Sequence, residues 1–241
     1  MSMEKVKLFI GSSSNGEDAL IEMAYEYTLR KNTDRDLEIV WMRQTKEENS
    51  FWHGFADQNW STPFSGFRWA IPEYCNFEGR AIYTDVDMLN FHDIGELFDM
   101  DMGDNVMLAR DGKRFGGKEF CVILFDCSKF KGSMPSAQWK AEPTAHHQFI
   151  NFVQQELPIG TLDPAWNSHD GDVEPFKQLH YTHMPTQPWK PKWFTGTPQK
   201  HPKPELSKLF WKSVEEAENN GYKVNDYIPS KQNYRYGIIG K

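Results

Sequence analysis

The feature that most constrains the fold of this chain is the order of its first three patterned segments. An apolar run at residues 5–11 ("KVKLFIG") ends at a glycine, and a second apolar run follows at residues 37–42 ("LEIVWM"). Between the two runs, apolar residues recur at helical spacing, and we expect Asn15 to cap that helix. Strand, helix and strand in this order predict the opening of a parallel α/β sheet, because parallel strands need a crossover connection.

The same kind of pattern continues to the C-terminus. Apolar runs rich in β-branched and aromatic residues predict further strands at 80–84, 105–110, 119–126, 157–161 and 176–184. Helical spacing predicts helices at 67–74, where Pro72 is a disturbance, and at 143–157 and 203–221, while residues 92–100 predict a short turn or helix. We therefore expect one α/β domain over residues 1–200, with residues 201–241 forming a C-terminal helix and tail that pack on it or extend from it.

Composition excludes several classes of protein. The 241 residues are 39% hydrophobic and 15% aromatic, which is enough for a packed core. The formal net charge of −7 argues against a nucleic-acid-binding protein, which normally carries a basic face. No apolar run reaches the length of a transmembrane helix, and the N-terminal run is too short for a signal peptide, so we expect a cytoplasmic protein.

The cysteines also indicate a cytoplasmic protein. Cys75, Cys121 and Cys127 are the only three, and each lies in an apolar run, so we expect reduced thiols in the core. The chain has no C-x-x-C pair, which argues against a zinc site.

Two acidic residues at the end of a predicted buried strand are the first sign of chemistry. The spacing D-x-D occurs four times, but only Asp85 and Asp87 ("YTDVDML") directly follow a buried strand. Ligands of open α/β sheets bind beyond the carboxyl ends of the strands. Two carboxylates about 6.5–7 Å apart on one side of an extended segment repel each other unless a cation lies between them. Mg²⁺ or Mn²⁺ with a substrate phosphate is the natural partner, and a solvated turn or a helix cap is the alternative.

A late segment, "LHYTHMPTQPW", offers a third ligand. His180 and His183 lie at the end of a predicted strand, and neutral imidazole binds Mn²⁺ better than Mg²⁺. A histidine that is buried and hydrogen-bonded for structural reasons is the alternative.

Together these segments resemble the nucleotide-sugar glycosyltransferases of the GT-A fold, particularly glycosyltransferase family 8, from about Lys5 to Trp193. The matching motifs are "FRWAIPEYCNFEGRAIYTDVDMLNFHDIGELFDM", "EFCVILFDCSKF", "HHQFINF", "LDPAWN" and "LHYTHMPTQPW". The resemblance implies a GT-A, Rossmann-like fold: a mixed, mostly parallel central sheet flanked by helices. It also implies a UDP-sugar donor, a saccharide or other glycosyl acceptor, and transfer with retention of anomeric configuration.

The resemblance also assigns roles to residues. Asp85, Asp87 and His180 would bind Mn²⁺ or Mg²⁺, with His183 as the rival third ligand. Gln148 would lie near the reacting sugar, and Arg68 would pair with a phosphate or with Asp85. Residues expected to hold the nucleotide are Phe9, Ile10, Gly11, Ser12, Arg68, Thr84, Asp85, Val86 and Lys190.

Three positions depart from the family pattern. His147 replaces an aspartate, Cys121-Val122 replaces Asn/Ser-Gly, and Gln187 replaces a lysine, with Lys190 as a substitute phosphate contact. These departures keep a non-catalytic carbohydrate-binding protein as an alternative. A metal-dependent nucleotidyltransferase or pyrophosphatase is the other, although "GSSSNGED" lacks the basic residue of a phosphate loop.

The residues that would bind the glycosyl acceptor are the hardest to predict from the sequence. Residues 43–64 have little periodicity and predict a long loop. Its aromatic and histidine residues could form a platform for a sugar ring, a hydrophobic lid or an oligomer contact: Phe51, Trp52, His53, Phe55 and Trp60.

Overall fold

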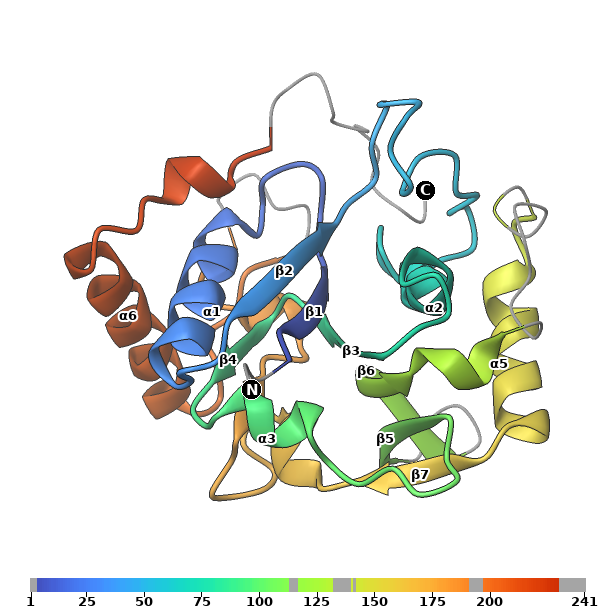
Figure 1. Cartoon of the computed structure of the whole chain (residues 1–241). Coiled ribbons are helices and arrows are strands. Elements are labelled where there is room, and N and C mark those ends of the chain that lie inside the picture. The colour runs from blue at the N-terminus through green and yellow to red at the C-terminus, as the bar shows by residue number, and fades with distance from the viewer. Residues whose placement is uncertain (1–3, 113–116, 132–139, 141, 191–196, 230–241) are drawn as a thin grey trace.

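The computed structural model describes residues 4–112, 117–131, 140, 142–190 and 197–229. A six-stranded sheet forms its centre, with strand order β2-β1-β3-β6-β5-β7 (Figure 1). The strands are β1 Val6–Gly11, β2 Leu37–Met42, β3 Arg80–Asp85, β5 Met107–Asp111, β6 Lys118–Asp126 and β7 Ile159–Leu162. β1 is parallel to β2 and β3, and β5 is parallel to β7, whereas β6 is antiparallel to both neighbours. The mixed, mostly parallel sheet expected from the sequence is confirmed.

The predicted helices form close to their expected positions. They are α1 Ala19–Lys31, α2 Ile71–Tyr74, α3 Ile94–Phe98, α5 Ala145–Glu156 and α6 Pro204–Asn219. Asn15 does not cap α1, because that helix begins only at Ala19 and its N-cap is Asp18. Pro72 lies in the first turn of α2, where a missing N–H costs nothing, and a 3₁₀ turn at Phe67–Ala70 precedes it.

α6 lies beside α1 at one edge of the molecule, and α5 lies at the opposite edge (Figure 1). The Tyr27 hydroxyl of α1 donates to Glu216 of α6, at 3.4 Å. The predicted C-terminal helix is therefore packed on the sheet domain, whereas residues 230–241 of the predicted tail lie outside the described part. Each helix in the described residues is too short or too polar to cross a membrane.

A second, three-stranded sheet was not predicted. β4 Met88–Asn90 pairs antiparallel with β9 Gln178–His180, which pairs parallel with β8 Ser168–His169. Because β4 follows β3 after only two residues, this small sheet brings the late histidine segment to the end of the central sheet.

Candidate functional site

The site lies where β1 and β3 end beside each other. Gly11, the last residue of β1, is in register with Asp85, the last residue of β3. Asp87 follows in the short connection to β4. This is the carboxyl edge of parallel strands, where open α/β sheets bind ligands.

Asp85 is held by two neighbouring side chains. Arg68 Nη2 donates to Asp85 Oδ1 at 3.2 Å, and the Tyr83 hydroxyl donates to the same oxygen. Arg68 Nη1 also donates to the Phe120 carbonyl, and the guanidinium lies 4.5 Å from the Tyr83 ring centroid. Arg68 is buried, so it is a fixed positive partner of Asp85 rather than a surface arginine.

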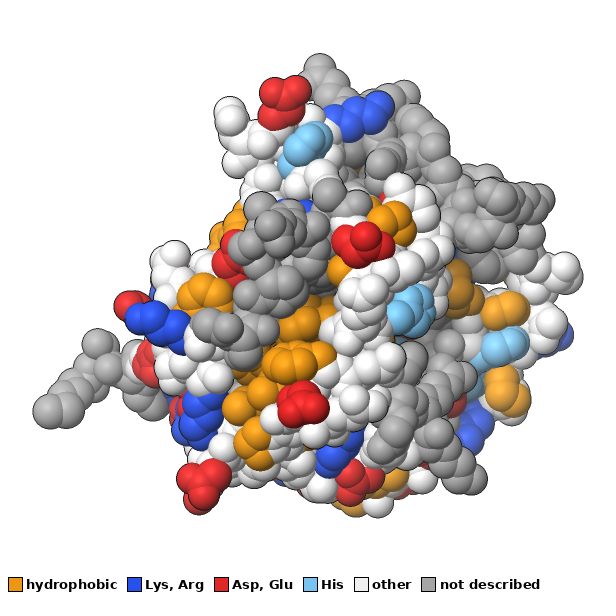
Figure 2. All heavy atoms as spheres, turned by 90° about the vertical axis from the view of Figure 1, so that its right-hand side faces the viewer, with side chains coloured by type: hydrophobic (Ala, Val, Ile, Leu, Met, Phe, Trp, Pro, Cys, Tyr) orange, Lys and Arg blue, Asp and Glu red, His pale blue; other side chains and the backbone are white. Residues whose placement is uncertain are grey.

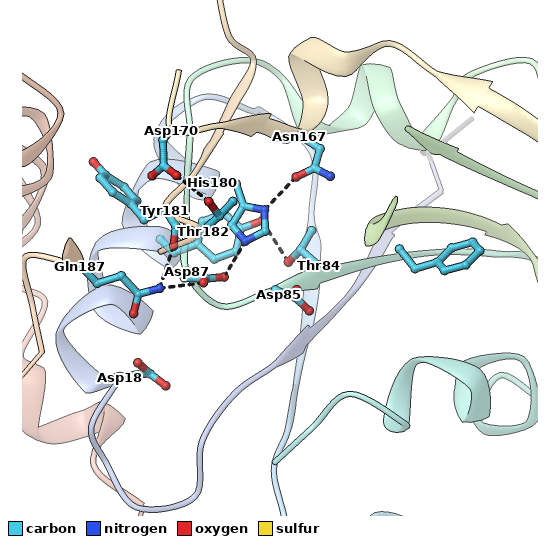
Figure 3. A network of polar contacts seen from close by, with 12 residues as sticks. Asp18, Thr84, Asp85, Asp87, Asn167, Asp170, His180, Tyr181, Thr182 and Gln187 are labelled. Carbon is cyan, nitrogen blue, oxygen red and sulfur yellow. Dashed lines mark hydrogen bonds and ion pairs between the residues drawn. The ribbon is translucent and has the colours of Figure 1, made fainter. Parts of the chain in front are cut away.

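Asp87 and His180 face each other (Figure 3). His180 Nε2 lies 3.1 Å from Asp87 Oδ1, and the His180 side chain is only 5% exposed. Gln187 Nε2 donates to Asp87 Oδ2 at 2.8 Å and to the Tyr181 carbonyl at 2.7 Å. Gln187, which replaces the lysine of the family motif, therefore fixes the Asp87 carboxylate.

Asn167 sets the tautomer of His180. Its Oδ1 lies 2.9 Å from His180 Nδ1, and an amide oxygen can only accept, so Nδ1 carries the hydrogen. Burial opposes a charge on His180, but the carboxylates of Asp87 and Asp85 outweigh it and raise the pKa of the imidazole. His180 is therefore either an imidazolium paired with Asp87, or a neutral ring whose Nε2 lone pair is directed at the carboxylate.

The second state fits a divalent ion. A neutral Nε2 and the oxygen of Asp87 would be two acceptors 3.1 Å apart, an arrangement that a shared cation stabilises. Asp87 Oδ1 is buried and accepts no hydrogen bond in the described residues. Carboxylate and imidazole donors, with the other histidine nitrogen hydrogen-bonded to the protein, are typical of metal sites.

A third donor to this site comes from β6. Single ligand atoms of Asp85, Cys121 and His180 all lie within 4.8 Å of one another. Burial and the Asp85 carboxylate raise the pKa of the Cys121 thiol well above its ordinary value. The predicted reduced core thiols are confirmed for the buried Cys75 and Cys127. Cys121 is also a free thiol packed against the core, but it is half-buried and lies beside Asp85 and His180.

Lys190, the proposed phosphate contact, lies against the start of α1. Its Nζ is 2.9 Å from Asp18 and 3.2 Å from Glu17. Burial disfavours the charge on Lys190, but these two carboxylates outweigh it and raise the lysine pKa.

The residues predicted to hold the nucleotide are mostly enclosed by the protein. The Ser12 hydroxyl donates to Glu22, which pairs with Arg43, and Thr84 accepts from Tyr25 at 3.1 Å. At Gly11, an added Cβ would lie 2.5 Å from the Phe64 ring, so the close approach that requires glycine comes from the chain itself. The side chains of Phe9, Ile10 and Val86 are buried.

Gln148 lies on the first turns of α5 and is exposed, and its amide donates to Thr144 at 2.9 Å. His146, on the same turn of α5, accepts a hydrogen bond from Trp69 Nε1 at its Nδ1, at 3.1 Å. Trp69 is next to Arg68 in the sequence, so this hydrogen bond links α5 to the segment that carries Arg68. His183 is exposed, unlike His180, and its carbonyl accepts from Thr186. This geometry favours His180 as the third ligand.

Of the alternatives for the aromatic residues of 43–64, the exposed platform is wrong for Trp52, Phe55 and Trp60. Trp52, Phe55 and Trp60 are at most 7% exposed. Trp52 stacks on Tyr74 with ring centroids 5.4 Å apart, and Phe55 packs edge-to-face on Phe67. These rings belong to the core although their segment has no periodic pattern. Removing apolar surface from water lowers the free energy of the folded chain in a loop as well as in a helix or strand.

Figure 2 shows the face of the molecule at the α5 side. Hydrophobic side chains gather near its middle, and Lys and Arg side chains lie scattered among acidic and hydrophobic ones. The described part of this face therefore carries no continuous basic patch.

The sequence motifs contain Asn167, Gln187 and Cys121 but do not assign them to the metal site, and no motif indicates His169. The His169 ring lies 5.3 Å from that of His180, and burial and His180 lower the pKa of His169 to about 4. Asn167 lies in "LDPAWN" and Gln187 in "LHYTHMPTQPW", so the resemblance of these motifs could have indicated both residues. Cys121 and His169 lie near His180 because strands far apart in the sequence pair with one another, which no local pattern reveals.

No protein-family model matches this chain, and no curated protein matches it in sequence. Solved structures do match it. The galactosyltransferase LgtC, in complex with donor and acceptor sugar analogues, has a TM-score of 0.59 and 13% identity over 88% of this chain and 96% of LgtC. The chain has the GT-A fold.

Two further glycosyltransferases share this GT-A fold. GlyE of Streptococcus pneumoniae TIGR4 has a TM-score of 0.59 and 17% identity over 97% of this chain and 65% of GlyE. The bifunctional glycosyltransferase WbbM has a TM-score of 0.61 and 12% identity over 90% of this chain and 53% of WbbM. The chain thus spans about half of WbbM and somewhat under two thirds of GlyE.

Proposed function

We propose that this chain is a metal-dependent glycosyltransferase. It would transfer a sugar from a nucleoside diphosphate, with uridine as the base, to a saccharide or other glycosyl acceptor, with retention of configuration. The observation that carries the proposal is the pairing of Asp87 with a buried, tautomer-fixed His180 at the carboxyl edge of a GT-A sheet. Base and retention rest on the resemblance of the sequence motifs alone.

Asp85, Asp87 and His180 would hold the ion, Mn²⁺ or Mg²⁺. When bound, such an ion stabilises the negative charge that develops on a diphosphate leaving group. Asn167 and Gln187 would orient His180 and Asp87, and Arg68 would hold Asp85 in place. Pre-organised ligands of this kind need no rearrangement when the donor enters.

The remaining chain would bind and orient the donor. The backbone of Phe9–Ser12 ends beside Asp85, which places it next to the ion for contact with base and ribose. Lys190 would contact a phosphate only by leaving Asp18 and Glu17, with which it pairs. Gln148 would face the sugar, because its helix contacts the segment that carries Arg68.

Calorimetry of a UDP-sugar with Mn²⁺ tests the assignment. The unchanged chain should bind the donor only with metal, and Asp87→Ala should lose this binding while remaining folded. Asp34→Ala is the matched control, since Asp34 belongs to another D-x-D pair and is exposed. Unchanged metal-dependent binding in Asp87→Ala would refute the proposal. Release of free sugar without transfer to any acceptor would instead favour a hydrolase.

A further inference from the structure

The metal-binding cluster contains a sulfur atom. Cys121 comes from β6, Asp85 from β3 and His180 from β9, and single donor atoms of all three lie within 4.8 Å of one another. No local spacing such as C-x-x-C connects them, because strand pairing alone brings them together. The absence of a C-x-x-C pair, which argued against a zinc site, therefore does not exclude a sulfur ligand in this cluster.

A second observation concerns His180 and its neighbour Asp87. His180 is buried and its Nδ1 is engaged with Asn167, which leaves Nε2 as the ring nitrogen that can bind a ligand. Asp87 Oδ1, 3.1 Å from that nitrogen, is buried and accepts no hydrogen bond in the described residues. In the neutral state of His180, its Nε2 lone pair, the Cys121 sulfur and the Asp85 carboxylate form a mixed N/O/S donor set, and Asp87 Oδ1 lies beside the imidazole.

We propose that Cys121 is a direct thiolate ligand of the bound ion, and that the site consequently prefers Co²⁺ or Zn²⁺ to Mg²⁺ and Mn²⁺. Thiolate is a soft ligand that selects borderline ions, whereas Mg²⁺ and Mn²⁺ suit carboxylate and water. On binding, the Cys121 S–H bond breaks, its proton passes to solvent, and a sulfur–metal bond forms. This inference rests on the proposed function, because the ion that Cys121 would bind is the one proposed to hold the donor diphosphate.

The geometry allows this bond after small side-chain movements. Sulfur lies about 2.3 Å from Zn²⁺, and nitrogen or oxygen about 2.0–2.2 Å, so neighbouring ligands of a tetrahedral ion are about 3.3–3.6 Å apart. The three donor atoms already lie within 4.8 Å of one another, so each pair has to approach by at most about 1.5 Å. β3 and β6 are paired from Arg80 to Thr84, which fixes the backbone on both sides.

The other two cysteines provide controls within the same chain. Cys75 and Cys127 are buried, and their thiols hydrogen-bond to each other rather than to the cluster. Serine at either position removes a thiol without touching Asp85 or His180.

Titration with Co²⁺ under a non-chelating reductant tests the proposal. We expect a near-ultraviolet thiolate-to-cobalt charge-transfer band that saturates at one ion per chain. The band should disappear in Cys121→Ser and persist in Cys75→Ser and Cys127→Ser. Zn²⁺ affinity, measured by competition with a chromogenic chelator, should fall at least about tenfold in Cys121→Ser, with little change for Mn²⁺.

A wild-type chain without the band, or a band that survives Cys121→Ser, would overturn the proposal. The proposed function is judged separately by nucleotide-sugar binding. Mn²⁺-dependent donor binding without the cobalt band would leave the glycosyltransferase assignment standing and remove the thiolate ligand. The band without any donor binding would do the opposite.

Discussion

At the scale of single residues, the orientation of His180 depends on Asn167. Asn167 is completely buried in the turn after β7, and its Oδ1 is the partner of His180 Nδ1. Without that acceptor, the imidazole could place its hydrogen on Nε2, the nitrogen that faces Asp87. The ring would then lose its lone pair on the side where an ion would bind.

Asn167→Ala should therefore weaken Mn²⁺ binding by about 10–100-fold, the usual effect of removing a hydrogen-bond partner of a ligating histidine. Calorimetric titration with Mn²⁺ measures this directly. Asn59→Ala is the control, because Asn59 is exposed and its amide donates to the Pro143 carbonyl at 3.2 Å, on a different segment from His180. Equal affinity in Asn167→Ala and the unchanged chain would show that the turn does not orient the ligand.

His146 predicts how stability depends on pH. Burial, Arg68 and His147 lower its pKa to about 3, and its Nδ1 accepts from Trp69. The unfolded chain has the ordinary histidine pKa of about 6.5, so it binds a proton that the folded chain excludes. The stability from neutral His146 is thus present above about pH 6.5 and is lost as the pH falls toward 3.

Urea unfolding should show about 2 kcal/mol less stability from this residue at pH 5 than at pH 7.5. His146→Gln should reduce that difference, whereas His183→Gln, at an exposed position, should leave it unchanged. A pH dependence identical in all three proteins would contradict the burial of a neutral imidazole.

At the scale of elements, the long segment between β2 and α2 is held by its aromatic residues. Trp52 lies on Tyr74 at an interplanar angle of 10° and contacts Phe9 of β1 edge-to-face. Residues 43–66 of this segment form no helix or strand, only an isolated bridge between Thr45 and His53. Its position next to β1 therefore depends on packed rings.

Trp52→Ala should cost about 3–5 kcal/mol of the free energy of unfolding, because it leaves a large cavity. Trp211→Ala should change little, since Trp211 is 48% exposed on α6. Chemical denaturation of the two variants decides between them. A similar small loss in both would mean that the rings of this segment do not support the fold.

Elements were predicted correctly from the sequence where the apolar periodicity extends over a whole helix or strand. β1, α1 and β2 carry clear periodicity over six to thirteen residues each, and the structure has them with small shifts. The small sheet was not predicted because β8 has two residues and β4 has three, too few to show an alternation of apolar and polar residues. Its pairing joins residues far apart in the chain, and so do the contacts of Cys121.

At the scale of the whole molecule, the site is assembled from both sheets. The central sheet supplies Asp85 and Cys121, the small sheet supplies His180, and Asp87 lies in the connection between them. The metal position would therefore couple two structural units. A ligand that binds there should stabilise the folded chain, since only the folded state brings these residues together.

The most direct test of the central claim is a thermal-shift experiment with UDP-sugars, with and without Mn²⁺. The account predicts that Mn²⁺ together with a matching UDP-sugar raises the Tm, while the sugar nucleotide alone has little effect. A ligand at 100 times its Kd should add about 2.7 kcal/mol of stability. The same Tm with and without Mn²⁺ for every nucleotide-sugar tested would contradict a metal-dependent donor site.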